Sequence, residues 1–258
     1  MVEARGSDNV ERAEGTGLHS VTNAARLLEC FRRSDELGVC DLARRLGVAK
    51  STAHRLAATL VGCGFLAQDG VTRRYSLGPS LAELGQVAAD RMPLRRAALP
   101  VLEQLRQRTD CTAHLALLDD LDVVYIERLV PSSCDPLFSH VSRRFPLHVT
   151  SSGTAISAFA PDLAERRVSA GLVHYTAATV RDEEVFRRRL EVTRQRGYAC
   201  TVEGAAKGVA SVAVPVLDGF GRPRAALSVA GPVKRVLADT DSLGRLVGSA
   251  VQWLKRVS

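Results

Sequence analysis

The pattern of apolar and polar residues predicts short helices in the first part of the chain. Apolar positions at helical spacing predict one helix over 20–31 and two more within 39–66. Between those two stands Gly47, where a helix end favours a left-handed residue. Two short helices joined by so tight a turn predict a helix-turn-helix, whose second helix enters the major groove of DNA.

The second of these helices has two different faces. Ala53, Leu56 and Leu60 recur at i, i+3 and i+7 and predict the buried face. The first turns carry cations and hydrogen-bonding groups of the kinds that contact phosphates and base edges. We therefore predict that DNA is contacted by five residues of this helix, Lys50, Ser51, Thr52, His54 and Arg55.

A hairpin is predicted directly after this helix. Residues 65–67 and 71–77 have strand character and are separated by the turn signal Asp69-Gly70. Such a hairpin after a helix-turn-helix is called a wing. Arg73 and Arg74 follow its turn, where a wing would contact the phosphate backbone. An ordinary helical hairpin with a solvated basic face is the alternative, but it does not account for the wing.

The remaining pattern predicts a linker helix and then a mixed domain. The helix over 79–92 has an apolar seam, and helical spacing resumes from residue 94. Strands are then predicted over 113–117, 123–129, 136–141, 209–217 and 224–229, with a basic loop at Arg143 and Arg144 and helices over 150–159, 161–170, 182–196 and 241–256. Helices before, between and after an antiparallel sheet predict an α+β fold.

The predicted organisation is therefore multidomain. Residues 1–18 have few large apolar side chains and are expected to be a disordered arm. Residues 19–78 form the predicted winged helix-turn-helix, 79–92 the linker helix, and 93–258 the α+β domain. A chain of 258 residues is long enough for two buried cores.

Composition narrows the class of protein. The net charge of +7 favours an anionic partner. The sequence shows no signal peptide and no apolar run long enough to cross a bilayer, so we expect a cytoplasmic protein without a membrane partner. The six cysteines form no CxxC pair and the six histidines no HExxH motif. We therefore expect no catalytic residues, no metal site and no cofactor.

Five segments in this order resemble the IclR family of bacterial transcriptional regulators. They are SVTNAARLLECF, VCDLARRLGVAKSTAHRLAATLVGCGFL, YSLGPSLAELG, RGYACTVEGAAKGVASVAVPV and AALSVAGP, and the resemblance extends from about residue 20 to 257. It implies a GAF-like effector-binding fold for residues 93–258. It also implies a ligand-responsive regulator, more typically a repressor, that binds a double-stranded DNA operator as a homodimer or a dimer of dimers.

The resemblance also implies where an effector binds. It carries the effector site onto Ser151, Ser152, Thr201, Val209, Ser211 and Ser228. A helix that begins near Ser151 would offer unpaired backbone N–H groups to a small carboxylate or lactone. The sequence departs from the family at Thr201 and Val202, where acidic residues are common, and at Ala230, where a second serine is common. We therefore expect a less polar effector than small keto acids.

Three alternatives remain open at this stage. The small residues around Ser151 could serve only close packing of a helix on a sheet. Cys111, Cys134 and Cys200 leave open a thiol-dependent GAF-type oxidoreductase or redox sensor with an accessory DNA-binding module, although a free cysteine is usually a buried small hydrophobe. A DNA-binding architectural protein that senses no ligand is the third.

Overall fold

The computed structural model describes residues 18–133 and 144–257, which form two compact units that meet between Arg91 and Met92. The predicted arm, apart from Leu18, lies outside the described residues. So do Arg143, Cys134 and the strand predicted over 136–141. Each unit is described by itself.

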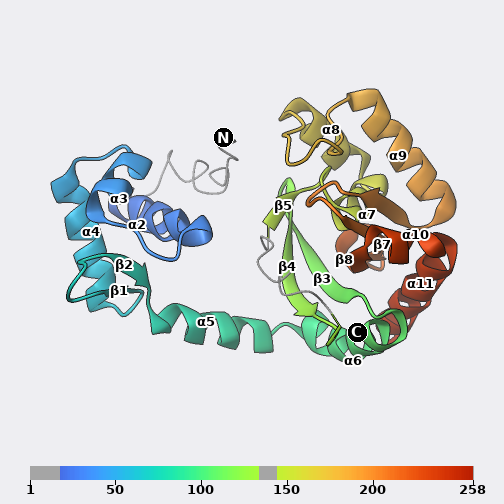
Figure 1. Ribbon diagram of the computed structural model, residues 1–258, viewed down its shortest axis with the longest axis horizontal. Coiled ribbons are helices and arrows are strands. Elements are labelled where there is room, and N and C mark those ends of the chain that lie inside the picture. Colours follow the sequence, from blue (N-terminus) through green and yellow to red (C-terminus); the bar gives the residue numbers. More distant parts are fainter. Residues whose placement is uncertain (1–17, 134–143, 258) are drawn as a thin grey trace. The chain divides into compact units, whose positions relative to one another are not determined.

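The first unit is a winged helix-turn-helix followed by one further helix (Figure 1). Gly47 ends the first helix of the motif with φ 68°, as its position in the sequence predicts. Leu27, Leu42, Ala53 and Leu60 are buried in its small core. Its elements are α2 (His19–Glu29), η1 (Cys30–Arg33), α3 (Val39–Leu46), α4 (Lys50–Gly62), β1 (Leu66–Gln68), β2 (Tyr75–Leu77) and α5 (Pro79–Asp90).

The wing differs from the predicted hairpin because its second strand begins later. Asp69 accepts hydrogen bonds at Oδ1 from the backbone N–H groups of Val71 (3.0 Å) and Thr72 (2.6 Å). These bonds fold the backbone into a loop, so only Tyr75–Leu77 pairs with β1. A side chain that bonds nearby backbone groups competes with the strand ladder for the same donors.

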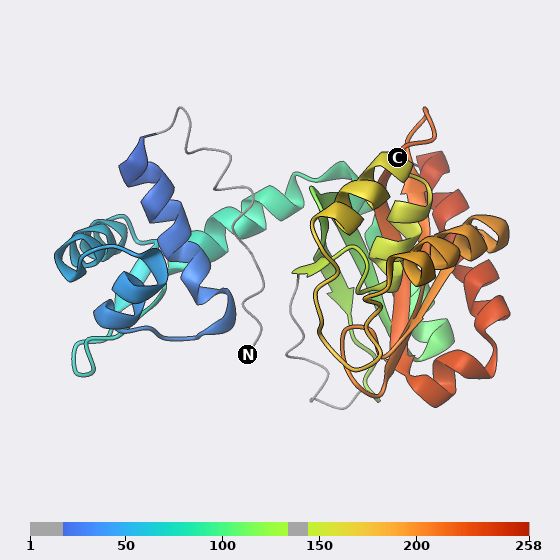
Figure 2. The same ribbon diagram turned by 90° about the horizontal axis from the view of Figure 1, so that it is seen from above.

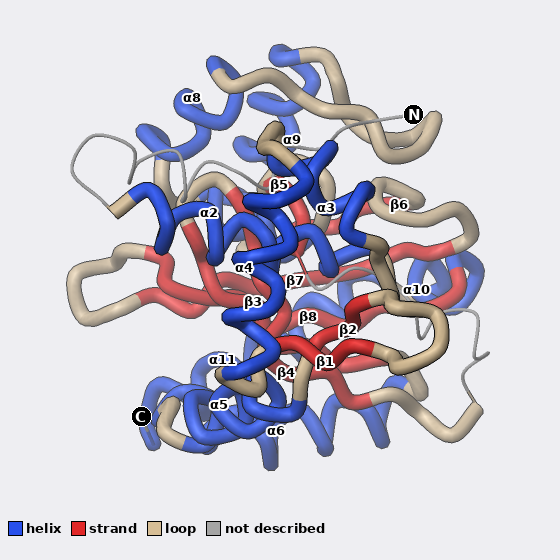
Figure 3. The backbone as a smooth tube through the Cα atoms, turned by 90° about the vertical axis from the view of Figure 1, so that its left-hand side faces the viewer, coloured by secondary structure: helices blue, strands red, loops and turns tan. Residues whose placement is uncertain are grey.

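The second unit is built on a six-stranded antiparallel sheet in the order β5-β4-β3-β8-β7-β6. Figure 3 draws its strands as red tubes. The strands are β3 (Thr112–Asp119), β4 (Asp122–Leu129), β5 (Arg144–Pro146), β6 (Ala199–Val202), β7 (Val209–Leu217) and β8 (Pro223–Pro232).

Helices cover both faces of this sheet. The larger core lies where Leu115, Val212 and Leu227 pack against α6 (Pro93–Thr109) and α11 (Thr240–Val257). The opposite face carries α7 (Ser151–Ala158), which in turn contacts α8 (Pro161–Ser169) and α9 (Glu183–Arg196). Figure 2 shows α8 and α9 in yellow and orange on one side of the sheet and α11 in red on the other. This arrangement confirms the predicted α+β fold.

Three elements of the second unit have no counterpart in the sequence prediction. They are strands β5 and β6 and the short helix α10 (Val233–Ala238). The loop predicted at Arg144 is therefore wrong, because Arg144 begins β5 and pairs with β4. All three elements are short, so none shows a repeated apolar pattern of useful length. Among the helices described, none is long and apolar enough to cross a membrane.

Candidate functional site

The recognition helix α4 presents its polar residues on one face. Ala53 and Ala57 are fully buried against α2 and α3, and Leu60 is 6% exposed. Five polar residues on the outward side are exposed, and they are the five predicted from sequence: Lys50, Ser51, Thr52, His54 and Arg55. The pattern of apolar residues alone was enough to orient this helix.

The arginines of the helix-turn-helix differ in how firmly the fold holds them. Arg45 donates to Cys30 O (2.7 Å) and Ser34 Oγ (3.1 Å), so it braces α3 against η1. By contrast, the side chains of Lys50 and Arg55 make no hydrogen bond or ion pair with any other described residue. The outward cations of α4 are therefore available to an external anion.

The two wing arginines are not equivalent. Arg74 donates to the backbone oxygen of Glu36 at 3.0 Å and lies 3.5 Å from the Glu36 carboxylate. Arg73 is exposed, has φ 57°, and its guanidinium has no partner within the described part of the chain. The sequence predicted the same role for both, because it gave no sign that Glu36 would lie beside Arg74.

In the second unit, α7 begins very close to the sheet. Thr150 caps it, accepting a hydrogen bond at Oγ1 from the N–H of Gly153 at 3.1 Å. A Cβ at Gly153 would come within 2.1 Å of Leu147 O, so only glycine fits there. Ser151 and Ser152 are fully buried in the first turn.

Hydroxyl pairs join this first turn to the sheet. Ser151 Oγ donates to Ser211 Oγ at 2.8 Å, and Ser211 Oγ lies 3.0 Å from Thr201 Oγ1. Ser152 Oγ donates to Ser228 Oγ at 3.1 Å. The structure thus brings together five of the six residues predicted for the effector site. Val209, the sixth, shares the face of β7 that carries Ser211, by strand alternation.

Beside these hydroxyl pairs lies a half-buried area of the sheet. We call it the sheet patch and define it by six half-buried residues on the α7 face, His114, Tyr125, Arg128, Val209, Ser211 and Ala230. Of these six residues, His114, Tyr125 and Arg128 were not predicted from the sequence as site residues. Their place depends on register, since His114 lies opposite both Arg128 and Ser228, and register is not visible in the sequence.

Two histidines of this unit are held neutral. Burial, reinforced by the charge of Arg128, lowers the pKa of His114 to about 3. Burial also lowers the pKa of His148 to about 4, partly offset by the bond between Nε2 and Val173 O at 2.9 Å. His148 packs edge-on against Phe186. It is therefore a packing histidine.

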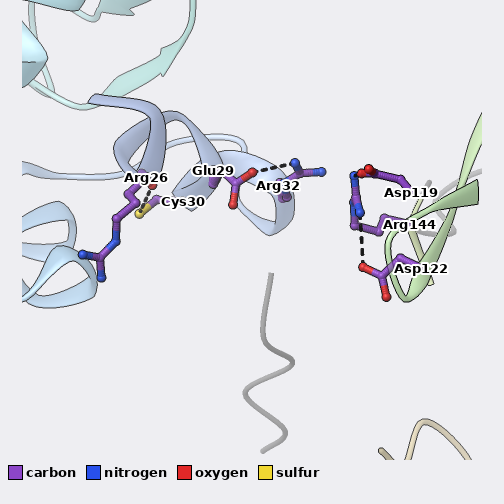
Figure 4. A network of polar contacts seen from close by, with 7 residues as sticks. All are labelled: Arg26, Glu29, Cys30, Arg32, Asp119, Asp122 and Arg144. Atoms are coloured by element: carbon purple, nitrogen blue, oxygen red, sulfur yellow. Dashed lines mark hydrogen bonds and ion pairs between the residues drawn. The ribbon is translucent and has the colours of Figure 1, made fainter. Parts of the chain in front are cut away.

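Three thiols in the described part of the chain, those of Cys30, Cys111 and Cys200, lack the surroundings of a reactive centre. Cys111 is buried, and burial raises the pKa of the Cys200 thiol above its ordinary value. Cys30 Sγ donates to Arg26 O at 3.3 Å (Figure 4). Within residues 18–133 and 144–257, no cluster of histidine, cysteine and carboxylate side chains could hold a metal ion.

The charged side chains at the β3–β4 turn form ion pairs with one another. Figure 4 shows Arg144 of β5 between Asp119 and Asp122, and its guanidinium pairs with both carboxylates. Burial raises the pKa of Asp122, and the nearby Arg144 partly reverses that rise. This cluster fastens β5 to the turn.

Comparison with known proteins matches both units. Residues 86–258 match the family model described as bacterial transcriptional regulator IclR C-terminal, and residues 20–70 match the IclR helix-turn-helix domain. The glycerol operon regulatory protein of Streptomyces coelicolor is 31% identical over 242 residues, which are 93% of this chain and 95% of that protein.

Solved structures agree over nearly the whole chain. A transcriptional regulator from Alicyclobacillus acidocaldarius matches with a TM-score of 0.79 at 31% identity, covering 92% of this chain and 99% of that one. An IclR homolog from Microbacterium hydrocarbonoxydans, solved in complex with 4-hydroxybenzoate, matches with a TM-score of 0.78 at 29% identity, covering 93% and 100%.

Proposed function

Because the chain belongs to the IclR family of bacterial transcriptional regulators, we propose that it binds its operator as a homo-oligomer and releases it when a small molecule binds the second unit. It is a DNA-binding regulator and not an enzyme, as its family and relatives are. We place it in the cytoplasm, where the operator is. We further propose that it represses, because a protein bound over a promoter blocks transcription without contacting polymerase.

The exposed face of α4 supports the DNA-binding part of this proposal. Lys50, Ser51, Thr52, His54 and Arg55 enter the major groove, and Arg55 contacts a guanine because its guanidinium offers a fork of donors. Arg73 on the wing contacts phosphate. Arg74 contributes less, because it is bound to Glu36.

The surface of α5 supports assembly. None of its residues is buried, and its apolar side chains Leu84 and Val87 are 54% and 39% exposed. One winged helix-turn-helix contacts little DNA, and regulators of this kind reach operator specificity through two-fold symmetry. We propose that α5 contributes to a homodimer, or to a dimer of dimers.

The first turn of α7 supports effector binding. We propose that a small carboxylate or lactone is held by Ser151, Ser152, Thr201, Val209, Ser211 and Ser228, with the sheet patch as its floor. The bound 4-hydroxybenzoate of the Microbacterium relative favours a small acid. The hydroxyl pairs fit this role because hydroxyls that bond one another can exchange partners for a ligand oxygen.

Two measurements test the proposal together. DNA sites are selected from a random pool by the full-length protein, and melting temperature is screened against small acids and lactones. At a hundred times its dissociation constant, a ligand adds about 2.7 kcal/mol of stability. We expect one compound to raise the melting temperature and weaken binding to the selected DNA. Specific DNA binding that no stabilising compound alters would contradict ligand-responsive regulation.

A further inference from the structure

We infer that Glu36 limits the affinity of the protein for DNA, because its carboxylate pairs with Arg74 on the wing and repels the phosphate that Arg74 would otherwise bind. The inference rests on the proposed docking of the wing on DNA and adds a residue that opposes it. Three features of the wing support this role. They are an exposed ion pair, a backbone that holds the wing without it, and an unpaired edge of the Arg74 guanidinium.

Glu36 and Arg74 lie on the outward side of a short backbone pairing. Leu37 and Tyr75 are antiparallel neighbours, and both of their side chains are buried. Glu36 and Arg74, each one residue earlier in the chain, are exposed. They are diagonal neighbours across the pairing, and long side chains can bridge that separation. The loop before α3 therefore places a carboxylate beside a wing cation.

The ion pair itself is weak. Arg74 Nε lies 3.5 Å from Glu36 Oε2, and the two side chains are 44% and 53% exposed. Water and salt screen such a pair, so it contributes little to stability. The main effect of the Glu36 carboxylate is therefore on the charge that the wing presents.

The backbone holds the wing in place without this ion pair. The N–H of Leu37 donates to Tyr75 O and the N–H of Tyr75 donates to Leu37 O, both at 2.9 Å. Arg74 Nη2 donates to the backbone oxygen of Glu36 at 3.0 Å, a bond that does not need the carboxylate. On the other side of the wing, the N–H of Asp69 donates to Arg74 O at 2.9 Å. The wing should therefore keep its position when the carboxylate charge is removed.

One edge of the Arg74 guanidinium can still take a phosphate. A guanidinium has five N–H donors, and only Nη2 and Nε of Arg74 form a hydrogen bond or ion pair with another described residue. A phosphate at Nη1 would lie beside the Glu36 carboxylate, well within about 10 Å, the Debye length at 0.1 M salt. The two anions would repel each other across one guanidinium, so Glu36 weakens this contact.

Glu36→Gln tests this role, because it removes the charge and keeps the length and the polar end of the side chain. Binding of the full-length protein is measured by anisotropy at several salt concentrations, with a duplex carrying a selected site and a scrambled duplex of the same length. We expect tighter binding to both duplexes by a similar factor, because phosphate contacts carry no sequence information. The salt slope should steepen by about one, so a roughly fourfold dilution of salt increases the gain about three- to fourfold.

Two further variants separate this contact from a general effect of charge. Asp35→Asn removes the same charge one residue away, at an exposed carboxylate that pairs with no other described residue, and should leave the salt slope unchanged. Glu36→Gln combined with Arg74→Ala should bind no more tightly than the unchanged protein, because the guanidinium that gains the phosphate is absent. The melting temperature of Glu36→Gln should stay close to that of the unchanged protein.

Three results would overturn the inference. They are weaker binding or loss of folded protein in Glu36→Gln, which would make the ion pair a support of the wing, an unchanged salt slope in that variant, and a gain in affinity that persists without Arg74. In each case, site-specific binding by the unchanged protein would leave the proposed function standing. Absence of site-specific binding by the unchanged protein would overturn both.

Discussion

The Ser152 hydroxyl on α7 donates a 3.1 Å hydrogen bond to Ser228 Oγ on β8, and both side chains are buried. A second pair, between Ser151 and Ser211, joins the same turn to β7. The start of α7 is therefore fixed to the sheet by side chains that can also bind oxygen. If the proposed effector binds here, its oxygen competes for these hydrogen bonds, and we expect the position of α7 relative to β7 and β8 to change.

Close packing of α7 predicts a large effect of one added methyl group. In Gly153→Ala the new Cβ would meet Leu147 O at 2.1 Å, so the backbone must move. We expect a loss of about 1–3 kcal/mol in the free energy of unfolding, the usual cost of overpacking. Urea unfolding measures it.

The matched control is Gly248→Ala in α11, where a Cβ meets nothing within 4 Å. This change should leave stability unchanged or raise it by about 0.5–1 kcal/mol, because alanine favours helix over glycine. Equal effects of the two substitutions would show that α7 is not tightly packed.

The lowered pKa of His148 predicts acid sensitivity. Its pKa is about 4 in the folded protein and near 6.5 when unfolded, so the unfolded chain binds the extra proton first. Stability from this group is complete above about pH 6.5 and is lost as pH falls toward 4, by at most about 1.4 kcal/mol per pH unit.

Replacing His148 by Gln removes the titration and keeps a donor for Val173 O. Urea unfolding between pH 7.5 and 5 should then show a shallower loss of stability than in the unchanged protein. His54→Gln, at an exposed position, should leave the slope as it was. A slope that does not respond to His148→Gln would assign the acid sensitivity to other groups.

Two arginine substitutions should weaken DNA binding in different ways. Arg55→Ala should cost about 1–3 kcal/mol and relax specificity at one base pair, because a base contact is lost. Arg73→Ala should weaken binding to all sequences and reduce the salt slope by about one, because a phosphate contact is lost. Anisotropy titrations at several salt concentrations measure both.

Arg188→Ala, at an exposed position on α9, removes the same charge from the second unit and is the control. It should change neither specificity nor the salt slope. Unchanged affinity in both Arg55→Ala and Arg73→Ala would remove the basis for docking α4 and the wing on DNA.

The exposed apolar side chains of α5 predict the assembly state. Leu84→Glu with Val87→Glu should shift the protein toward monomer in sedimentation velocity, because the carboxylates would be buried in the interface. Val185→Glu, at a valine 44% exposed on α9, is the control and should leave the sedimentation coefficient unchanged. An assembly that persists in the double variant would place the interface elsewhere.

Sequence patterns were sufficient to predict features that depend on a single helix or strand. The spacing of Ala53 and Leu60 orients α4, and the glycine at position 47 ends α3. The second strand of the wing is shorter than predicted. The carboxylate of Asp69 accepts hydrogen bonds from backbone N–H groups at the start of the predicted strand, so these groups do not pair with β1. Local side-chain bonds of this kind leave no periodic signal.

The site in the second unit was only partly predictable, because it depends on strands far apart in the chain. The serines came from the family pattern. The place of His114 beside this site is known only from the strand register, which puts it opposite Ser228, 114 residues later in the chain. Neither strand has a sequence signal for that pairing. The bond between Arg74 and Glu36 was missed for the same reason.

The most direct test of the account uses Ser211→Leu combined with Ser228→Val, which fills the proposed effector site from β7 and β8. Binding to the selected DNA is titrated by anisotropy with and without the compound that stabilises the unchanged protein most, and exposed Ser169→Leu is the control. We predict that the double variant stays folded, binds DNA with unchanged affinity and no longer responds to the compound. A folded double variant that still releases DNA as readily as the unchanged protein would contradict the account.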